Sequence, residues 1–542
     1  MTAGAIVIDP DRAYRKRLAA GDPDGTKPLG GLIDRLQSAG LLVRARPAPS
    51  ALEIRGLAFD SRLVEPGSLF VAVPGEHVDG HAFIGQAAER GAVAAVVERP
   101  LDSALPQLVV RRSQEALAVA AAWWYEDPSA RLGIVGITGT DGKTSTARLT
   151  ASVLDAGGWQ TGIVSTIGGR IGGMDESQPS HTTTPQAPEL QRALRAMHAA
   201  GDQAAVVETT SHGLAQGRVN GVRYDLAAFT NLSHEHLDFH GTFEAYLVAK
   251  RSLFERLAVD ERNPAKAVPG WPRTGIVNID DPAAGAFVDA TRHAGARVLT
   301  YGRGRSADLR LVGVDDDGRR LRLTWDGPSG RQAAALQLAG SFNAYNALAA
   351  AAVGVAVDVD GAAVLAGLEA LSHVPGRMQR VDLGQPFGVV IDYAHSPNAL
   401  MVVLDELDPV ARARGGSLIA VFGSAGERDA DKRPMMGRIA AERCRLVIAT
   451  NEDPRNEDAM TILDAIAEGA EAAGAVRGET VLLIEDRRQA IRRAFRAARP
   501  GDVVLLAGKG HENTMLMANG RALPWDERAA AVEALRELGH AA

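Results

Sequence analysis

The last third of the chain carries five short runs of consecutive apolar residues, each bounded by a turn signal. The runs are FGVVIDYA, SLIAVFG, RLVIAT, TVLLIED and DVVLLAG, in order between residues 387 and 508. Runs of this kind predict strands that are buried on both faces, and helical segments follow most of them. We therefore predict a doubly wound parallel sheet over residues 374–542, with ligands at the carboxyl ends of its strands.

The middle of the chain shows the same alternation with longer spacing. Its strand runs are RLGIVGIT, QAAVVET, DLAAFTNL and TGIVNI. Helical segments separate them, which favours a parallel sheet. Further on, residues 308–327 (DLRLVGVDDDGRRLRLTWDG) alternate with a period of two around an Asp-Gly turn. This pattern predicts an antiparallel insertion within a domain over residues 131–373.

Shorter elements precede this domain. Between residues 51 and 130, the strand runs SLFVAVP, VAAVVE and QLVV alternate with helical segments, which predicts a small α/β domain. Residues 1–50 are predicted to form an N-terminal extension with one helix, LGGLIDRLQSAGLL. Three domains suit a chain of 542 residues, which is too long for one hydrophobic core.

Composition narrows the class of protein. A hydrophobic content of 46% and a charged content of 23% are typical of a globular protein. The formal charge of −7 argues against a nucleic-acid partner, which calls for a basic face. The single cysteine, Cys444, excludes an intramolecular disulfide and suits a reducing compartment. Because no apolar run of about 18 residues and no signal-peptide core is found, we expect a cytoplasmic protein without membrane contact.

A glycine-rich turn in residues 133–154 (GIVGITGTDGKTSTARLTASVL) is the strongest single motif. A strand, a glycine turn and a helix start together form a phosphate cradle, because backbone N–H groups and the helix dipole attract an anion. Lys143 could reach the outer phosphates, and the Thr144 hydroxyl could bind Mg²⁺. Ile137 stands where the common spacing has glycine, and Asp141 places a carboxylate in the turn.

Three further residues follow predicted strands or lie in a nearby helix. Glu208 ends a strand and could complete a Mg²⁺ shell with Thr144, or it could cap the next helix. His236, in NLSHEHLDFHG, is taken alone more often a hydrogen-bonded structural histidine than a ligand. Lys250, in the helical TFEAYLVAKRSLFERL, would ordinarily be a solvated surface lysine.

Many separate motifs occur in one order along the chain. They include GITGTDGKTSTA, TTTP, VVETTSHGLAQGR, FTNLSHEHLDFHG, GSFNAYNALAA, VPGRMQRVD, VIDYAHSPNAL, GSAGERDADKRPMMG, EDPRNED and AGKGHE. In this order they resemble the Mur ligases, most closely the MurE-type tripeptide synthetases of peptidoglycan assembly, over roughly residues 52 to 530. The resemblance implies a small UDP-binding α/β domain, a central P-loop ATPase-like domain and a C-terminal Rossmann-like domain that binds the amino acid.

The resemblance also implies an activity. An ATP-dependent, ADP-forming ligase would activate the D-Glu carboxylate of UDP-MurNAc-L-Ala-D-Glu as an acyl phosphate, which the amine of a diamino acid then attacks. Lys143, Glu208, His236 and Lys250 would be catalytic, with Mg²⁺ held by Thr144 and Glu208 and a second metal by His236. Lys250 aligns with a lysine that carries a carbamate, an anionic oxygen ligand. A monomer is expected.

Binding residues follow from the same resemblance, motif by motif. For ATP they are Gly139, Thr140, Asp141, Gly142, Lys143, Thr144, Ser145, Asn343, Asn346, Arg377 and Asp392. For the UDP-sugar peptide they are Ser61, Glu76, His77, Val78, Thr183, Thr184, Thr210, Gln216 and Arg218. For the amino acid they are Arg428, Glu452, Asp453, Pro454, Arg455, Gly508 and Glu512. Taken alone, the asparagines could cap helices, Arg377 could be a linker residue, and Asp392 and Ser61 could form turns.

The amino acid follows from charge. Arg455 can hold a carboxylate and Glu512 an ammonium, which suits meso-diaminopimelate better than L-lysine or L-ornithine. Asp141, Glu235 and Glu452 depart from the family pattern, and Glu452 could change which diamino acid fits. Two other classes stay open: a folylpolyglutamate-synthetase-like ligase, and a non-catalytic nucleotide-binding scaffold.

Overall fold

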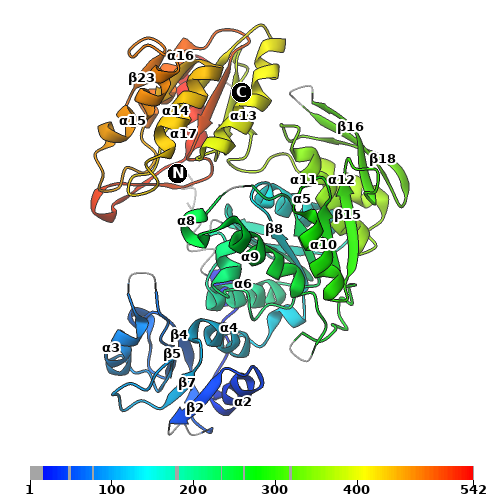
Figure 1. Ribbon diagram of the computed structural model, residues 1–542, viewed down its shortest axis with the longest axis vertical. Helices are drawn as coiled ribbons and strands as arrows, with labels where there is room; N and C mark the ends of the chain where they lie inside the picture. The colour runs from blue at the N-terminus through cyan, green and yellow to red at the C-terminus, as the bar shows by residue number, and fades with distance from the viewer. Residues whose placement is uncertain are drawn as a thin grey trace, which may run out of the picture. The chain divides into compact units, whose positions relative to one another are not determined.

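A computed structural model describes residues 16–46, 50–75, 78–176, 182–233, 235–260, 263–316 and 320–540. The chain forms two compact units, and each is described by itself (Figure 1). The first unit takes in the chain up to Val312 together with Trp325–Gln332 and Tyr345–Leu368. The second takes in Gly313–Thr324, Ala333–Ala344 and the chain from Glu369 onward.

The N-terminal part of the first unit is a five-stranded sheet in the order β2-β7-β6-β5-β4. Its strands are β2 (Leu42–Arg46), β4 (Gly56–Ala58), β5 (Ser68–Val71), β6 (Ala94–Val97) and β7 (Gln107–Val110). Four of them are parallel, and β2 runs antiparallel to β7. The helices here are α2 (Gly30–Ser38), α3 (Ile84–Glu89) and α4 (Ser113–Trp124), with the short pair β1 (Lys27–Pro28) and β3 (Glu53–Ile54) beside them.

The structure differs here from the predicted N-terminal extension. The helix predicted in LGGLIDRLQSAGLL is present as α2, but its leucines Leu32 and Leu36 are fully buried in the core of the five-stranded sheet. β2 adds an edge strand to the same sheet. The sequence LVRAR of this strand interleaves arginines with small apolar residues, so it lacks the continuous apolar run that marks the central strands. Residues 27–46 therefore belong to the first folded domain.

The central sheet has eleven strands in the order β11-β10-β9-β12-β8-β13-β14-β15-β16-β17-β18. The strands are β8 (Gly133–Thr138), β9 (Thr161–Ser165), β10 (Gly168–Ile171), β11 (Met174–Glu176), β12 (Ala204–Glu208), β13 (Leu226–Phe229), β14 (Thr274–Asn278), β15 (Arg297–Gly302), β16 (Leu309–Asp316), β17 (Leu321–Gly327) and β18 (Gly330–Leu336). Neighbouring strands from β9 to β16 in this order pair in parallel, as predicted. The predicted insertion appears as the neighbours β16 and β17, and its Asp-Gly turn lies outside the described residues.

Helices accompany this sheet along the chain (Figure 1). They are α5 (Lys143–Ala156), α6 (Ala187–Ala199), α7 (Ser211–Ala215), α8 (Leu237–His240), α9 (Phe243–Glu255), α10 (Ala284–His293), α11 (Asn343–Ala356) and α12 (Gly361–Ala370). α5 follows the central strand β8 directly, so the glycine turn between them stands at the carboxyl edge of the sheet. That edge is where parallel sheets place their ligands.

The second unit contains a six-stranded sheet in the order β19-β20-β24-β21-β22-β23. Its strands are β19 (Gln379–Arg380), β20 (Gly388–Asp392), β21 (Leu418–Phe422), β22 (Cys444–Ala449), β23 (Val481–Leu483) and β24 (Val503–Ala507). All five predicted strands are present and pair in parallel, and only β19 is antiparallel. A small hairpin, β25 (Thr514–Leu516) and β26 (Ala522–Pro524), follows β24.

Helices cover both faces of the six-stranded sheet (Figure 1). The helices are α13 (Pro397–Ala413), α14 (Lys432–Arg443), α15 (Ala459–Ala472), α16 (Arg487–Ala497) and α17 (Glu527–Glu537). Along β24, Leu505 packs with α13, α14 and α15, while Val504 packs with α16 and α17. This alternation is the doubly wound arrangement predicted from the apolar runs, and the predicted α/β class is confirmed. Within the described ranges, every helix falls short of the length and apolar character that a membrane crossing needs.

Candidate active site

The glycine turn after β8 has a backbone that only glycine adopts easily. Gly139 and Gly142 have φ angles of 149° and 78°. A Cβ at Gly142 would lie 2.3 Å from Oδ1 of Asn346, and one at Gly139 would lie 1.9 Å from Oγ1 of Thr230. Both positions therefore need glycine for conformation and for space. Asn346, predicted from its motif alone, lies against this turn and accepts a hydrogen bond from the Thr146 hydroxyl at 3.2 Å.

The predicted carboxylate of the turn, Asp141, has an exposed side chain. Its backbone oxygen accepts hydrogen bonds from Thr230 Oγ1 at 2.7 Å and from Asn231 Nδ2 at 3.2 Å, and its N–H donates to Asn231 Oδ1 at 3.0 Å. The neighbouring Lys143 donates from Nζ to the Thr140 carbonyl at 2.6 Å. The turn is thus held by its backbone and by β13-end side chains, which does not require the Asp141 carboxylate.

Glu208, at the end of β12, lies directly beside Thr144. The Thr144 hydroxyl donates to both carboxylate oxygens of Glu208, at 3.1 Å each. Thr166 donates to the same carboxylate from its backbone N–H at 3.0 Å and from its hydroxyl at 3.1 Å. Glu208 does not cap the next helix, because that role belongs to Thr210. A buried carboxylate and hydroxyl at this spacing form a set of oxygen donors that suits Mg²⁺.

Lys250, on α9, is only 2% exposed and is not a surface lysine. Its Nζ donates to the Gly139 carbonyl at 2.6 Å and lies 4.4 Å from the centre of the Tyr246 ring. Burial holds the pKa of this amine well below its ordinary value, and the nearby Lys143 lowers it further. A buried amine with a lowered pKa beside a glycine turn has the chemistry of a nucleophile or a site of modification.

His236 stands in the loop after β13, with a left-handed φ of 55° and a side chain that is 44% exposed. Its ring packs edge-on against His212 at 4.7 Å between centroids, and Nε2 lies 3.7 Å from the Glu235 carboxylate. Among the described residues, no group of three or more histidine, cysteine, aspartate or glutamate side chains is placed to hold a metal. The predicted role of His236 as a ligand of a second metal stays a prediction.

Four of the residues predicted for the sugar peptide form one hydrogen-bonded cluster. The Thr184 hydroxyl donates to the Glu208 carbonyl at 2.9 Å and lies 3.0 Å from the Thr210 hydroxyl. Arg218 donates to the Thr184 carbonyl at 2.8 Å and to Oε1 of Gln216 at 2.5 Å. A fifth residue, Thr183, lies 3.0 Å from the Thr166 hydroxyl. This cluster adjoins Glu208, so the peptide-side prediction and the metal-side prediction fall on one edge of the central sheet.

Two of the residues predicted for the UDP-sugar peptide, Ser61 and Val78, lie in the N-terminal sheet domain. Ser61 is buried and its hydroxyl donates to Oε1 of Gln86 at 2.5 Å. Val78 is 56% exposed. Glu76 and His77 lie outside the described residues.

The remaining predicted ATP residues belong to the second unit. Asn343 is buried and donates from Nδ2 to the Ala339 carbonyl at 2.6 Å. The Arg377 guanidinium lies 4.9 Å from the Tyr393 ring centre. Asp392 is buried at the end of β20 and accepts from the N–H groups of Met378 and Ala394 at 2.8 Å each. Burial raises the pKa of Asp392, and Arg377 opposes that rise. Asp392 thus forms a strand-end turn, the alternative named from sequence.

The residues predicted for the amino acid, apart from Arg428 in the segment after β21, follow β22 and β24 at the carboxyl edge of the six-stranded sheet. Asp453 accepts from Lys509 Nζ at 2.8 Å and from the Leu516 N–H at 2.8 Å. Glu512 accepts from the same Lys509 at 2.5 Å and from the Tyr393 hydroxyl at 3.3 Å. Lys509, a residue of the GKGHE motif that was not predicted as a site residue, is therefore the central cation of this cluster. Glu512 is already paired with it.

Two polar atoms of this region lie buried without a partner. Among the described residues, neither Oε2 of Glu452 nor Nε of Arg455 has a hydrogen-bond partner. Burial raises the pKa of Glu452, and His395, Lys432 and Lys509 oppose that rise. The backbone turns sharply here, with a φ of 54° at Arg455. A buried acceptor and a buried donor left open in one loop are ready for a ligand that carries the complementary groups.

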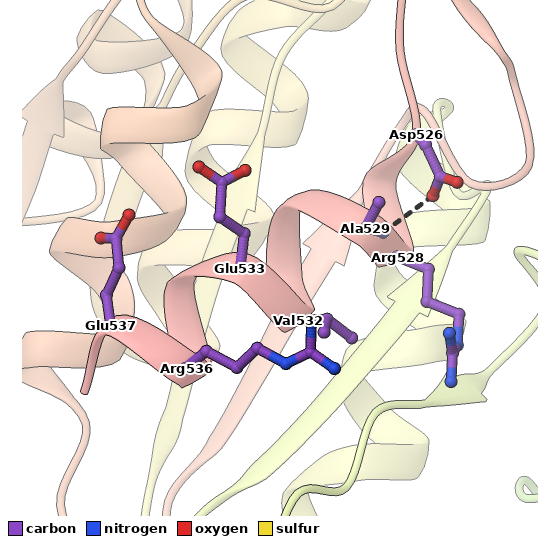
Figure 2. A pocket seen from close by; sticks show the side chains of 7 residues that line it. All are labelled: Asp526, Arg528, Ala529, Val532, Glu533, Arg536 and Glu537. Atoms are coloured by element: carbon purple, nitrogen blue, oxygen red, sulfur yellow. Dashed lines mark hydrogen bonds between the residues drawn. The ribbon is translucent and has the colours of Figure 1, made fainter. Parts of the chain in front are cut away.

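The other predicted residues of this loop region differ in exposure. Arg428 is exposed, Pro454 is buried, and Gly508 has a φ of 100°. A Cβ at Gly508 would lie 2.4 Å from Oε2 of Glu452, so glycine is what allows the two loops to approach each other. A separate surface hollow of about 670 Å³ in this unit holds none of these residues. It is lined by α17 and by Asp526, whose carboxylate accepts from the Ala529 N–H at 2.8 Å (Figure 2).

Comparison with known proteins matches these domains one by one. Residues 53–125 match the model of the Mur ligase family catalytic domain, residues 137–354 the Mur ligase middle domain, and residues 376–510 the Mur ligase glutamate ligase domain. A UDP-N-acetylmuramyl-tripeptide synthetase of Roseiflexus sp. (strain RS-1) is 48% identical over 92% of this chain and 97% of its own length.

Two further similar proteins carry a more specific name. A UDP-N-acetylmuramoyl-L-alanyl-D-glutamate–2,6-diaminopimelate ligase of Bacillus licheniformis is 39% identical over 90% of this chain and 95% of its own. A solved structure of a ligase of the same name is 29% identical, with a TM-score of 0.64 over 95% of this chain and 100% of its own. The resemblance read from the motifs is confirmed: this chain belongs to the Mur ligase family.

Proposed function

We propose that this chain is an ATP-dependent, ADP-forming ligase that joins meso-diaminopimelate to the D-Glu of UDP-MurNAc-L-Ala-D-Glu in peptidoglycan precursor synthesis. The observation that carries the proposal is the cluster at the carboxyl edge of the central sheet. There Thr144 and Glu208 lie 3.1 Å apart, and the buried Lys250 meets the glycine turn at 2.6 Å. The names of two similar proteins, a tripeptide synthetase and a diaminopimelate ligase, support the proposed substrates.

Phosphoryl transfer requires positioning and cationic stabilisation, and the chain's residues fit both needs. The backbone N–H groups from Gly139 to Thr144 and the start of α5 would hold the ATP phosphates. Lys143 would turn from the Thr140 carbonyl, which it contacts at 2.6 Å, to the outer phosphates. Thr144 and Glu208 would hold Mg²⁺, which, when bound, neutralises the phosphate oxygens.

Lys250 is proposed to carry a carbamate. Its neutral amine would add to the carbon of CO₂, forming one N–C bond and releasing one proton to solvent. The product is an anion where an amine stood, so the residue changes from a repelled neighbour of Lys143 into a partner for a cation. The lowered pKa of the Lys250 amine supports this step, because only the unprotonated form has a free electron pair.

The amino-acid end is proposed to use the two open atoms of the loop after β22. Arg455 would donate to the distal carboxylate of diaminopimelate, and Glu452 would accept from its ammonium. This replaces Glu512 as the sequence-derived ammonium acceptor, because Lys509 already lies 2.5 Å from it. L-lysine or L-ornithine would leave Arg455 without its partner, which is costly for a desolvated cation.

The proposal is tested by ADP release from purified protein with ATP, Mg²⁺ and UDP-MurNAc-L-Ala-D-Glu, adding one amino acid at a time. Turnover with meso-diaminopimelate alone is the expected result. Turnover with L-lysine or L-ornithine keeps the ligase and discards the role of Arg455. Turnover only with a folate and glutamate favours the folylpolyglutamate class. ATP binding without any turnover favours a scaffold, and Lys143→Ala then keeps all its partner contacts.

The same proposal covers the cellular setting. We place the enzyme in the cytoplasm as a monomer, with small-molecule substrates as its partners. The single cysteine suits a reducing compartment. Sedimentation of the purified protein and fractionation of the producing cell test these two points.

A further inference from the structure

Two helices of the second unit are joined at their first residues by a fully buried ion pair. Arg487 begins α16 and Glu527 begins α17, and both side chains are 0% exposed. The guanidinium donates from Nη2 to Oε1 of Glu527 at 2.7 Å and from Nε to Oε2 at 2.9 Å. Trp525 donates from Nε1 to the same carboxylate at 2.7 Å. A bidentate pair without water has one well-defined geometry.

The rest of the guanidinium is used on backbone carbonyls. Nη1 donates to the Asn451 carbonyl at 3.2 Å, and Nη2 donates to the Ala507 carbonyl at 2.7 Å. Asn451 directly precedes Glu452, and Ala507 directly precedes Gly508. One side chain therefore fixes the starting points of both loops that carry the proposed amino-acid-reading residues.

The spacing between these two loops has little tolerance. A Cβ at Gly508 would lie 2.4 Å from Oε2 of Glu452, so the loops touch without room for a methyl group. The Lys509–Asp453 ion pair, at 2.8 Å, crosses between the same loops one residue further along. A shift of a few tenths of an ångström in either loop would move the open oxygen of Glu452 relative to a bound ammonium.

The pair is not the only link between the two helices, because apolar residues of α16 and α17 also pack in one core. Arg488 and Arg492 of α16 already meet Glu533 and Glu537 of α17 in surface ion pairs at 2.6 to 2.8 Å. A buried ion pair contributes little net stability compared with apolar residues of the same size. Its geometry, with four hydrogen bonds from one fork, suits positioning, and a lysine could not reproduce it.

We propose that Arg487 and Glu527 are positioning residues for amino-acid recognition, so that helix α17 sets the spacing of the loops after β22 and β24. The inference rests on the proposed function for the identity of the ligand. Arg487 touches no substrate in this account. It acts through the carbonyls of Asn451 and Ala507.

The main test is the double variant Arg487→Met with Glu527→Leu, which replaces the pair by apolar side chains that the buried site can hold. We expect the KM for diaminopimelate to rise about tenfold or more, while kcat at saturating amino acid and the KM for ATP stay within about twofold of wild type. The matched control is Arg492→Gln with Glu537→Gln, which removes an exposed pair between the same two helices. The control should leave all three constants unchanged.

Further measurements keep the result decisive. If the double variant does not fold, Glu527→Gln serves instead, because it keeps the size of the side chain and an oxygen for Arg487 and Trp525. Amide hydrogen exchange should become faster in residues 451–455 and 508–512 in the pair variant and not in the control. An unchanged KM with unchanged exchange in a folded variant overturns the inference. Absence of turnover in the wild type instead rejects the proposed function, and the exchange experiment still decides the positioning role.

Discussion

Two buried lysines in different parts of the chain meet opposite surroundings. Lys250 lies in the central sheet domain with a carbonyl at 2.6 Å and an aromatic ring at 4.4 Å, and the described residues place no carboxylate within ion-pair distance of it. Lys509 lies in the six-stranded sheet domain between two carboxylates, Asp453 at 2.8 Å and Glu512 at 2.5 Å. Their side chains are equally inaccessible, so burial alone does not tell what each one does.

The difference lies in what compensates the lost hydration. An ammonium between two carboxylates replaces its hydration with two ion pairs and crosslinks the loops that hold them. The Lys250 ammonium loses water and gains no carboxylate within ion-pair distance among the described residues. Burial and the nearby Lys143 therefore hold its pKa well below the ordinary value, and the more distant carboxylates of Glu235, Asp141 and Glu208 oppose this only in part. We therefore expect Lys250 to act as a reactive amine and Lys509 to act as a structural ion-pair partner, and substitution of each lysine tests its role.

The largest effect is expected at Lys250. Lys250→Arg keeps a positive charge but has no amine able to add to CO₂, so we expect turnover to fall by about a thousandfold or more. Initial rates of ADP release measure this loss. With ¹³C-labelled bicarbonate, the wild type should show a carbamate carbon signal in NMR that the variant lacks. Near-normal turnover in Lys250→Arg would mean that the residue acts simply as a cation.

A smaller effect, on stability instead of rate, should separate the two lysines. Lys509→Met leaves the buried Asp453 and the half-buried Glu512 without their cation, and we expect it to lower the free energy of unfolding by about 2–3 kcal/mol. Lys250→Met should not destabilise the protein in CO₂-free buffer at pH 7. Because the folded-state pKa of Lys250 is lowered, the wild-type amine destabilises the folded state at low pH, and this penalty is lost as the pH rises towards the ordinary value of 10.5. Met removes that dependence.

Urea unfolding of both variants, monitored by signals from each unit, measures these differences. Arg492→Gln is the control, because it removes only surface ion pairs, those with Glu533 and Glu537. An equal loss of unfolding free energy in Lys250→Met and Lys509→Met would contradict the different roles assigned to the two lysines.

Substitution of Glu452 tests whether its charge binds the ammonium of the amino acid. Glu452→Gln keeps the shape of the side chain but removes the charge that is proposed to hold the ammonium, so the KM for diaminopimelate should rise about tenfold while the KM for ATP stays unchanged. The folded-state pKa of Glu452 is raised by burial. In the wild type, this KM should therefore rise as the pH falls through that raised pKa, and in the variant it should stay flat over the same range.

The pH dependence of the free energy of unfolding tests the titration of Glu452 independently. A raised carboxyl pKa contributes stability that is complete below the ordinary value of 4.5 and is lost as the pH rises through the folded-state value. Glu452→Gln should therefore be more stable than the wild type above that range. If its KM and its stability both match the wild type at every pH, Glu452 is neither buried as a charge nor used in binding.

The strands of this protein could be predicted where burial on both faces requires a continuous apolar run, as in β20, β21, β22 and β24. The edge strand β2 could not, because a strand with one partner tolerates the arginines of LVRAR. The glycine turn is equally local, since its conformation is set by Gly139 and Gly142 themselves. Lys250 and Glu208 were predicted as site residues from the order of the family motifs. The hydrophobic pattern around them does not indicate that they are buried.

The residues that sequence reasoning missed act across long separations. Lys509 forms its buried ion pair with Asp453, which precedes it by 56 positions. Arg487 forms its pair with Glu527, which follows it by 40. Nothing near Arg487 in sequence indicates that its charged side chain is buried. For Lys509 there was one local signal, because it lies between two glycines, Gly508 and Gly510, that let other segments of the chain come close.

The smallest effect is expected in the hydroxyl cluster beside Glu208. Thr210 Oγ1 accepts from the Gly213 N–H at 3.1 Å as the cap of α7 and lies 3.0 Å from the Thr184 hydroxyl. Thr210→Ser keeps both contacts, so turnover should stay within about twofold of wild type, as expected where the hydroxyl is the working group. Thr210→Ala removes both and should lower stability by about 1 kcal/mol.

The order of these two variants distinguishes a capping role from a packing role. If Thr210 matters through its methyl group, Ala would be the milder change and Ser would be no rescue. If the hydroxyl matters, Ser stays near the wild type in both ADP release and urea unfolding, and Ala falls below it. The cluster beside Glu208 would then depend on neutral hydroxyls that can be exchanged for one another. The two carboxylates that pair with Lys509 carry full charges and do not tolerate the loss of their cation.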